Sequence, residues 1–238
     1  DLAVHSLKDL PTQLPAGLAI AVITEREDAR DALVLREAVT SVFPSLDTLP
    51  AGAVVGTSSP RRLAQLKHFH PHLRIKELRG NVDTRLRKLD AGEYDAIILA
   101  VAGLSRLGFA HRISERIQPG KMLPAVGQGA LAIEIRADDA GVHDFLAPLD
   151  HGPTRAACTA ERALLRALGG GCQLPIAAHA VVREEHLKLD GLVAAPSGET
   201  LIREAIKGKA SEAAQLGEAL AGRLIERGAN SLIAGLII

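Results

Sequence analysis

Strand-like and helix-like segments alternate from the first residue to about residue 146, and this alternation restricts the possible folds most strongly. The apolar stretch AVVGTSS (53–59) leads into the helical period RRLAQLKHF. RIKEL, the helical VDTRLRKLDAG and the strand-like YDAIILAVAG then continue the pattern. Such alternation is typical of βαβ units. The sequence therefore predicts an α/β fold with a mainly parallel sheet.

The same patterning predicts the other elements. Strands are expected over 1–7, 18–24 and 130–136, with helices around 104–108 and near 140–146. From Gly152 onward the character changes to α+β. A helix carrying ERALLRAL is followed by strands AAHAVV, HLKLDGLVAA and TLIREAIKG and by the amphipathic helix SEAAQLGEALAGRLIERG. A domain boundary is predicted near Leu149–Pro153.

Composition bounds the class of protein. The chain has 238 residues, of which 47% are hydrophobic, so it can bury the cores of two or three domains. No apolar run reaches the length of a membrane span. The two cysteines lie in different surroundings and do not look like a disulfide framework, which favours a reducing cytoplasm. The chain begins inside an expected strand, so a preceding segment is expected.

The formal net charge is zero, but residues 59–90 hold nine Lys or Arg against three acids. This excess predicts an anionic partner. At the turn Gly56–Arg62, Thr57, Ser58 or Ser59 can cap a helix that begins at Pro60, and its first backbone N–H groups can bind an anion. Arg61 and Arg62 add forked donors for carboxylate or phosphate. A capped helix with solvated arginines is the alternative.

Three further places carry candidate chemistry. Arg79-Gly80-Asn81 and then Arg85 repeat the basic turn at a second strand end. Asp9 follows the first strand, where open α/β sheets bind ligands, and could pair with a developing cation. His5 is expected to be a buried, satisfied histidine.

Cys172 lies in Gly169-Gly170-Gly171-Cys172-Gln173, directly after a predicted helix. This placement offers a thiol for covalent chemistry, whereas Cys158 is expected to pack inside the helix. From the residues alone, a glycine helix cap followed by a small, partly buried cysteine remains an equal alternative.

Five motifs together resemble the porphobilinogen deaminase (hydroxymethylbilane synthase) family. They are VHSLKDLP, GTSSPRR, LRGNVDTRLRKLDAGEYDAIILAVAGLSRLG, LPAVGQGALAIE and ERALLRALGGGCQLPI, in this order and over nearly the whole chain. The family has further βα units ahead of VHSLKDLP, so an N-terminal segment is expected to precede Asp1. Whether the chain is active without that segment is left open by the sequence.

The resemblance implies two α/β domains like those of periplasmic binding proteins, with a cleft between them, and a small α+β domain. The first would hold residues 1–27 and 128–148, the second 28–127 and the third 152–238. The implied cofactor is a dipyrromethane joined to Cys172 by a thioether. Four porphobilinogens are then condensed head to tail with loss of ammonia, and hydrolysis releases hydroxymethylbilane. The family implies a monomer. A cytoplasmic location is expected from the cysteines, and no nucleic-acid, membrane or metal partner is expected.

The resemblance also assigns residues. Asp9 corresponds to the catalytic aspartate, which stabilises positive charge on the pyrrole nitrogen as ammonia departs. Since every pyrrole carries an acetate and a propionate, a bank of basic and hydroxyl groups suits the growing chain. The implied cofactor- and substrate-binding residues are Ser6, Lys8, Thr57, Ser58, Ser59, Arg61, Arg62, Arg79, Gly80, Arg85, Ala100, Arg106 and Gln128.

Two other classes of function stay open beside this one. A non-catalytic protein of two α/β lobes could close on a carboxylate ligand, but it would leave the GGGCQLP loop unexplained. A nucleic-acid binder could use the basic stretch 59–90, but 2% aromatic residues leave little for base stacking.

Overall fold

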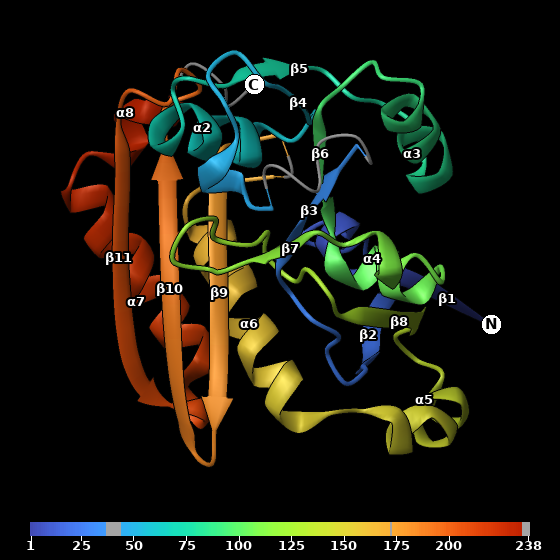
Figure 1. The fold of residues 1–238 in the computed structure, drawn as a ribbon. Helices are drawn as coiled ribbons and strands as arrows, with labels where there is room; N and C mark the ends of the chain where they lie inside the picture. The colour runs from blue at the N-terminus through green and yellow to red at the C-terminus, as the bar shows by residue number, and fades with distance from the viewer. Residues whose placement is uncertain (37–43, 172, 235–238) are drawn as a thin grey trace.

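The computed structural model describes residues 1–36, 44–171 and 173–234. The strands of these residues form three sheets. Helices lie beside the first two sheets, and a layer of helices covers one face of the third (Figure 1). The first sheet has the order β1-β8-β2 and is antiparallel throughout. Its strands are β1 (Leu2–Ser6), β2 (Leu18–Ile23) and β8 (Leu131–Arg136), and helix α5 (Ala140–Leu146) follows β8.

The second sheet has five strands in the order β5-β4-β6-β3-β7. The strands are β3 (Asp31–Leu35), β4 (Val54–Gly56), β5 (Arg74–Lys76), β6 (Ala96–Ala100) and β7 (Glu115–Ile117). The helices between them are α2 (Pro60–Phe69), α3 (Val82–Asp90) and α4 (Val101–Arg106). Apolar clusters on both sides of this sheet, one around Leu33 and one around Ile97, form the core.

The mainly parallel sheet predicted from the sequence is wrong. Strand β4 is parallel to β5 and β6, but β3 is antiparallel to both β6 and β7. Strands β3 and β7 were not predicted. The sequence pattern indicates strands that are joined to a sheet neighbour by a crossover helix, and neither β3 nor β7 is joined in this way. The predicted strand over 94–103 also ends early, since Ala100 is the N-cap of α4 and Val101 and Leu104 are buried as helical residues.

The third sheet, β11-β10-β9, is an antiparallel meander, as expected for the α+β part of the chain. Strands β9 (Ile176–Arg183), β10 (His186–Ala194) and β11 (Leu201–Lys209) pack against α6 (Gly152–Ala167) and α7 (Ala213–Glu226), with α8 (Ala229–Ile233) beyond. Figure 1 shows these helices on one face of the sheet. Short 3₁₀ turns occur at Leu7–Asp9, Leu46–Thr48, Ala110–Arg112, Ala147–Leu149 and Ala210–Glu212.

A buried ion pair joins α6 to the two segments that connect the first and second sheets. Glu161 is fully buried and binds the Arg26 guanidinium at 2.6 and 3.1 Å. Its two carboxylate oxygens also accept the backbone N–H groups of Gly127 and Ala180, each at 2.7 Å. Arg26 in turn donates to the carbonyl of Gln128 at 2.8 Å. These bonds hold α6 and the third sheet against the two connecting segments that contain Arg26 and Gly127.

Changing Glu161 to Gln should destabilise the fold by about 3–5 kcal/mol, because Arg26 loses its buried partner and an amide N–H₂ meets backbone donors. Urea unfolding would measure this loss. Glu218→Gln is the matched control, because Glu218 forms an exposed pair with Arg166 at 3.6 Å and such pairs contribute about 1 kcal/mol or less. Equal losses in the two variants would contradict the structural role of Glu161.

Candidate functional site

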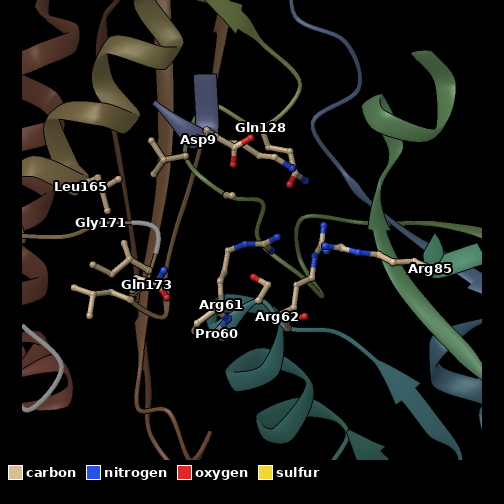
Figure 2. A pocket seen from close by; sticks show the side chains of 16 residues that line it. Asp9, Pro60, Arg61, Arg62, Arg85, Gln128, Leu165, Gly171 and Gln173 are labelled. Atoms are coloured by element: carbon tan, nitrogen blue, oxygen red, sulfur yellow. The ribbon is translucent and has the colours of Figure 1, made fainter. Parts of the chain in front are cut away.

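A cavity of about 480 Å³ is lined by residues that belong to the regions of all three sheets (Figure 2). The turn after β1 contributes Lys8 and Asp9, and the region of the second sheet contributes the start of α2 and Arg85 of α3. The remaining walls come from Leu165 of α6, from Ala125, Val126 and Gln128, and from Gly171, Gln173, Leu174 and Ile176. Most of the polar groups predicted from the sequence meet here.

The turn into α2 presents its first groups to this cavity. Strand β4 ends at Gly56, where a Cβ atom would lie 2.8 Å from the Tyr94 ring, so close packing requires glycine. Ser59 occupies the N-cap position and Pro60 the first helical turn, as predicted. The Ser59 side chain makes no capping bond and lines the cavity. The Ser58 hydroxyl donates to the carbonyl of Leu78.

Arg61 and Arg62 are almost completely buried and share one carboxylate, that of Asp31 at the start of β3. Arg61 donates to Asp31 at 2.7 and 3.3 Å, and Arg62 donates to it at 3.1 and 2.6 Å. Further bonds run from Arg61 to the Leu123 carbonyl at 2.7 Å and from Arg62 to the Ile98 carbonyl at 2.9 Å. The two arginines of the GTSSPRR motif are therefore held rigidly and are not solvated side chains.

This cluster carries more positive than negative charge. Burial alone would raise the pKa of Asp31, but Arg61 and Arg62 hold it well below its usual range, so the carboxylate is ionised. Burial lowers the pKa of Arg61, and the neighbouring Arg62 lowers it further. Two cations compete for one anion, and Arg61 Nε has no hydrogen-bond partner within the described part of the chain. An additional anion would complete the cluster.

Two more cations lie at the cavity. Arg85 is partly exposed and is oriented by a 2.7 Å bond from its Nε to the Gly80 carbonyl. Its pKa is lowered by burial and then by Arg62, and that of Lys8 is lowered by the same two causes. Lowered pKa values on three basic groups facing one cavity are expected where positive charges gather without enough counter-charge.

Asp9 and Gln128 form a further wall of the cavity (Figure 2), and the Gln128 amide donates at 3.0 Å to the Asp31 oxygen that also binds both arginines. Gln128 is buried between Gly127 and Gly129, both of which have positive φ angles of +70° and +91°. A Cβ on Gly127 would lie 3.0 Å from the Leu7 side chain, and Leu7 N–H donates to the Ala130 carbonyl at 3.0 Å. These contacts hold the turn that carries Asp9 beside the VGQG segment. His5 lies outside this wall and is half-buried against Glu134 at 2.9 Å.

Cys172 lies outside the described residues, but its neighbours Gly171 and Gln173 line the cavity. Cys158 is fully buried in α6, in an apolar cluster with Leu7 and Ile23. Burial and the nearby Glu161 carboxylate raise the pKa of its thiol to about 12. The prediction that Cys158 is a packing residue is thus confirmed.

Six of the predicted residues do not line this cavity. Arg79 is 80% exposed and pairs with Glu77, Thr57 is buried beside Ser59, and Arg106 donates to the Gly129 carbonyl at 2.8 Å. The others are Ser6, Gly80 and Ala100. Their assignment to cofactor or substrate remains a prediction.

Sequence reasoning missed Asp31. The signal was an acidic residue opening the short apolar run DALVL, all of which is buried. An ionised carboxylate in such a position needs buried cations.

The fold and the cavity define an α/β protein in which buried cations and the loop residues Gly171 and Gln173 line one cavity. A family model described as "Porphobilinogen deaminase, dipyromethane cofactor binding domain" matches residues 1–144, and "Porphobilinogen deaminase, C-terminal domain" matches residues 155–226. The porphobilinogen deaminase of Chromobacterium violaceum is 54% identical over all of this chain and 75% of its own length. That of Synechococcus elongatus is 52% identical over 98% and 72%.

The chain therefore belongs to the porphobilinogen deaminase family, a family of transferases in tetrapyrrole biosynthesis that use a dipyrromethane cofactor. Within the described residues no helix is long and apolar enough to cross a membrane.

Solved structures of low sequence identity were also found. The periplasmic VFT2 domain of Bordetella pertussis BvgS covers 55% of this chain and 53% of its own at 16% identity, with a TM-score of 0.34. The P235GK mutant of ArgBP from T. maritima covers 54% and 53% at 18% identity, with a TM-score of 0.33. Scores this low add nothing to the assignment, which depends on the sequence relatives.

Proposed function

We propose that the cavity is the place where this chain condenses porphobilinogen molecules head to tail, with loss of ammonia, and releases hydroxymethylbilane. One observation carries this proposal: a buried excess of positive charge faces the loop residues on either side of Cys172. Every pyrrole of the substrate and of the cofactor brings an acetate and a propionate, which match those cations.

The residues present fit a dipyrromethane attached at Cys172. Arg61 Nε is a buried donor without a partner in the described residues, and a ligand carboxylate would satisfy it. Lys8, Ser58, Ser59, Arg62 and Arg85 would bind the other carboxylates. When bound, the cofactor supplies the pyrrole carbon on which the chain is built.

Asp9 is the proposed catalytic residue. Its carboxylate lies at the cavity, across from the arginine cluster (Figure 2). As ammonia leaves the substrate, positive charge develops on the pyrrole nitrogen. A fixed carboxylate stabilises this charge more strongly in the transition state than in the ground state. The arginines cannot do this, because they carry the same sign of charge.

The proposal also covers the division into domains, the oligomeric state and the location of the protein. We assign residues 1–27 and 128–148 to a first domain, 28–127 to a second and 152–238 to a third, because each division contains one of the three sheets. A monomer is proposed by analogy with the family. A cytoplasmic location is proposed because the two cysteines do not suggest a disulfide framework.

Arg85→Leu should raise the KM for porphobilinogen about tenfold, because a partly buried cation loses its ligand carboxylate. This variant is preferable to changes at Arg61 or Arg62, each of which would also remove one of the two arginines that bind the buried Asp31 carboxylate. Arg87→Leu is the matched control, since Arg87 is an exposed residue of the same helix and does not line the cavity. Arg85→Lys should restore only part of the affinity, because lysine lacks the forked donors. Similar KM changes in the Arg87 and Arg85 variants would contradict the proposed role of Arg85.

The direct test of the function is the mass of the purified protein under denaturing conditions, with mapping of the peptide around Cys172. An added dipyrrole on that peptide is expected, together with heavier species after incubation with porphobilinogen. A protein that binds porphobilinogen but never gains mass would be a carboxylate-binding relative. A steep salt dependence of RNA affinity, in a protein without bound pyrrole, would instead favour a nucleic-acid-binding function.

A further inference from the structure

The third sheet has one face that helices α6 and α7 do not cover, since both helices pack on the other face (Figure 1). At one end of the open face, Leu192 of β10 lies in an apolar cluster with Ala64 and Leu123, which closes that end. Further along, the face lines a hollow of about 700 Å³ that Pro119 and Gly120 border. This hollow shares no lining residue with the cavity described above.

Basic side chains dominate the hollow. Its four cations are Arg183, Lys188, Arg203 and Lys207, and its one acidic residue is Asp190. The Asp190 carboxylate pairs with Lys188 at 2.9 Å and with Arg203 at 3.5 Å. Within the described residues, the exposed Arg183 and Lys207 form no ion pair. One carboxylate is therefore shared by two cations, and two further cations have no counter-charge.

Strand pairing places like charges opposite each other at this hollow. Lys188 of β10 pairs with Lys207 of β11 on one side and with Val181 of β9 on the other. Like charges in directly opposed positions destabilise an antiparallel pair of strands. Departures from such rules are expected where a site binds a ligand, and here the ligand that would remove the repulsion is an anion.

Lysines on an open sheet can also serve only for solubility and to prevent pairing with other chains. Such lysines need neither a hollow nor apolar surface between them. Here Val181, which is 41% exposed, lies opposite Lys188 and two residues from Arg183 on the same face of β9. Exposed apolar surface bordered by cations is complementary to a ligand whose carboxylates surround an apolar body.

We propose that this hollow binds a flat organic polycarboxylate, whose ring lies on Val181 and whose carboxylates meet Arg183, Lys188 and Lys207. The volume of the hollow lies within the range of small-molecule pockets, about 300–1,000 Å³. The contact with Val181 distinguishes this ligand from an inorganic anion, which has no apolar surface to bury. The site is separate from the cavity proposed for condensation, and the inference does not depend on that proposal.

The test follows the methyl NMR signals of Val181 while benzene-1,2,4,5-tetracarboxylate is added at constant ionic strength. Saturating shifts are expected. Butane-1,2,3,4-tetracarboxylate carries the same four carboxylates without a ring, and it should bind about three- to tenfold more weakly because it buries less apolar surface. Equal affinity for the two tetracarboxylates, or equal competition by inorganic phosphate, would show a general patch of charge and would overturn the proposal.

Lys207→Gln should weaken binding of the benzene tetracarboxylate about three- to fivefold, the effect of losing one exposed ion pair. Its urea midpoint without ligand should not fall, because the substitution removes the repulsion from Lys188. Lys209→Gln is the matched control, since Lys209 is an exposed lysine of the same strand that does not line this hollow. Equal losses of affinity in the two variants would contradict the site.

Porphobilinogen, as a further ligand, identifies the source of the carboxylates. Val126 lines the other cavity and reports on it separately. Shifts at both valines would assign the hollow to the pyrrole acids of the proposed reaction, whereas shifts at Val126 alone would assign it to aromatic acids from outside that reaction. Absence of a Val126 shift would count against the proposed function. Absence of a Val181 shift with the benzene tetracarboxylate would overturn this inference alone.

Discussion

Cys172→Ser yields a protein without covalently bound pyrrole. A thiol is needed because sulfur, as a thiolate, is a far stronger nucleophile than a serine hydroxyl. The loop residues on either side of position 172 line the basic cavity, so the attached group would lie among its cations. We expect complete loss of the dipyrrole mass from the peptide around residue 172, and with it loss of turnover.

Cys158→Ala is the control for this experiment. Cys158 is fully buried, and the pKa of its thiol is raised to about 12, so it is protonated and inaccessible at neutral pH. This variant should keep its dipyrrole and remain active, with some loss of stability from the removed sulfur. Pyrrole still bound to the Cys172→Ser protein would refute the assignment of the attachment residue.

Asp9→Ala is expected to lower turnover about a hundred- to thousandfold, the range found when a preorganised charge-stabilising group is removed from an active site. Asp9 is an anion at the cavity, whereas carboxylate binding is assigned to the cations that line it. The variant should therefore retain much of its cofactor, which the denatured mass would reveal. The fall should appear in kcat more than in KM, because the charge that Asp9 stabilises exists only in the transition state.

Asp144→Ala is a suitable control, since Asp144 is 86% exposed on α5 and its contact with His143 is a surface one. It should leave both cofactor content and turnover unchanged. Turnover at the unsubstituted level in Asp9→Ala would remove Asp9 from the mechanism, even if the cofactor assignment to Cys172 held.

Most helices and strands could be predicted because their causes are local. The helix near 140–146 was expected from its periodicity and occurs there, beginning after the Asp139 N-cap. In α3, Asn81 caps the helix by accepting the Thr84 N–H at 2.9 Å. The prediction failed for β3 and β7, whose pairing partners lie far away in the chain and whose direction in the sheet no local pattern records.

For the same reason, some residues of the candidate site could be predicted from the sequence and others could not. Arg61, Arg62, Asp9 and Gln128 stand in motifs that can be recognised in the sequence, and the cavity brings them together. Asp31 is in no such motif, yet it binds three of the side chains around it. Asp31 has these partners only because β3, α2 and the VGQG segment lie side by side in the folded protein.

The amino-acid sequence by itself determined the family, the kinds of chemical group at the site and most local elements, because motifs, caps and periodicity act over a few residues. Folding in three dimensions decided which cations became buried and which carboxylate they share. Desolvation and the sharing of one carboxylate by two arginines arise from contacts between distant segments. Such contacts change the charge balance and hydrogen bonding of a residue without changing anything near it in the chain.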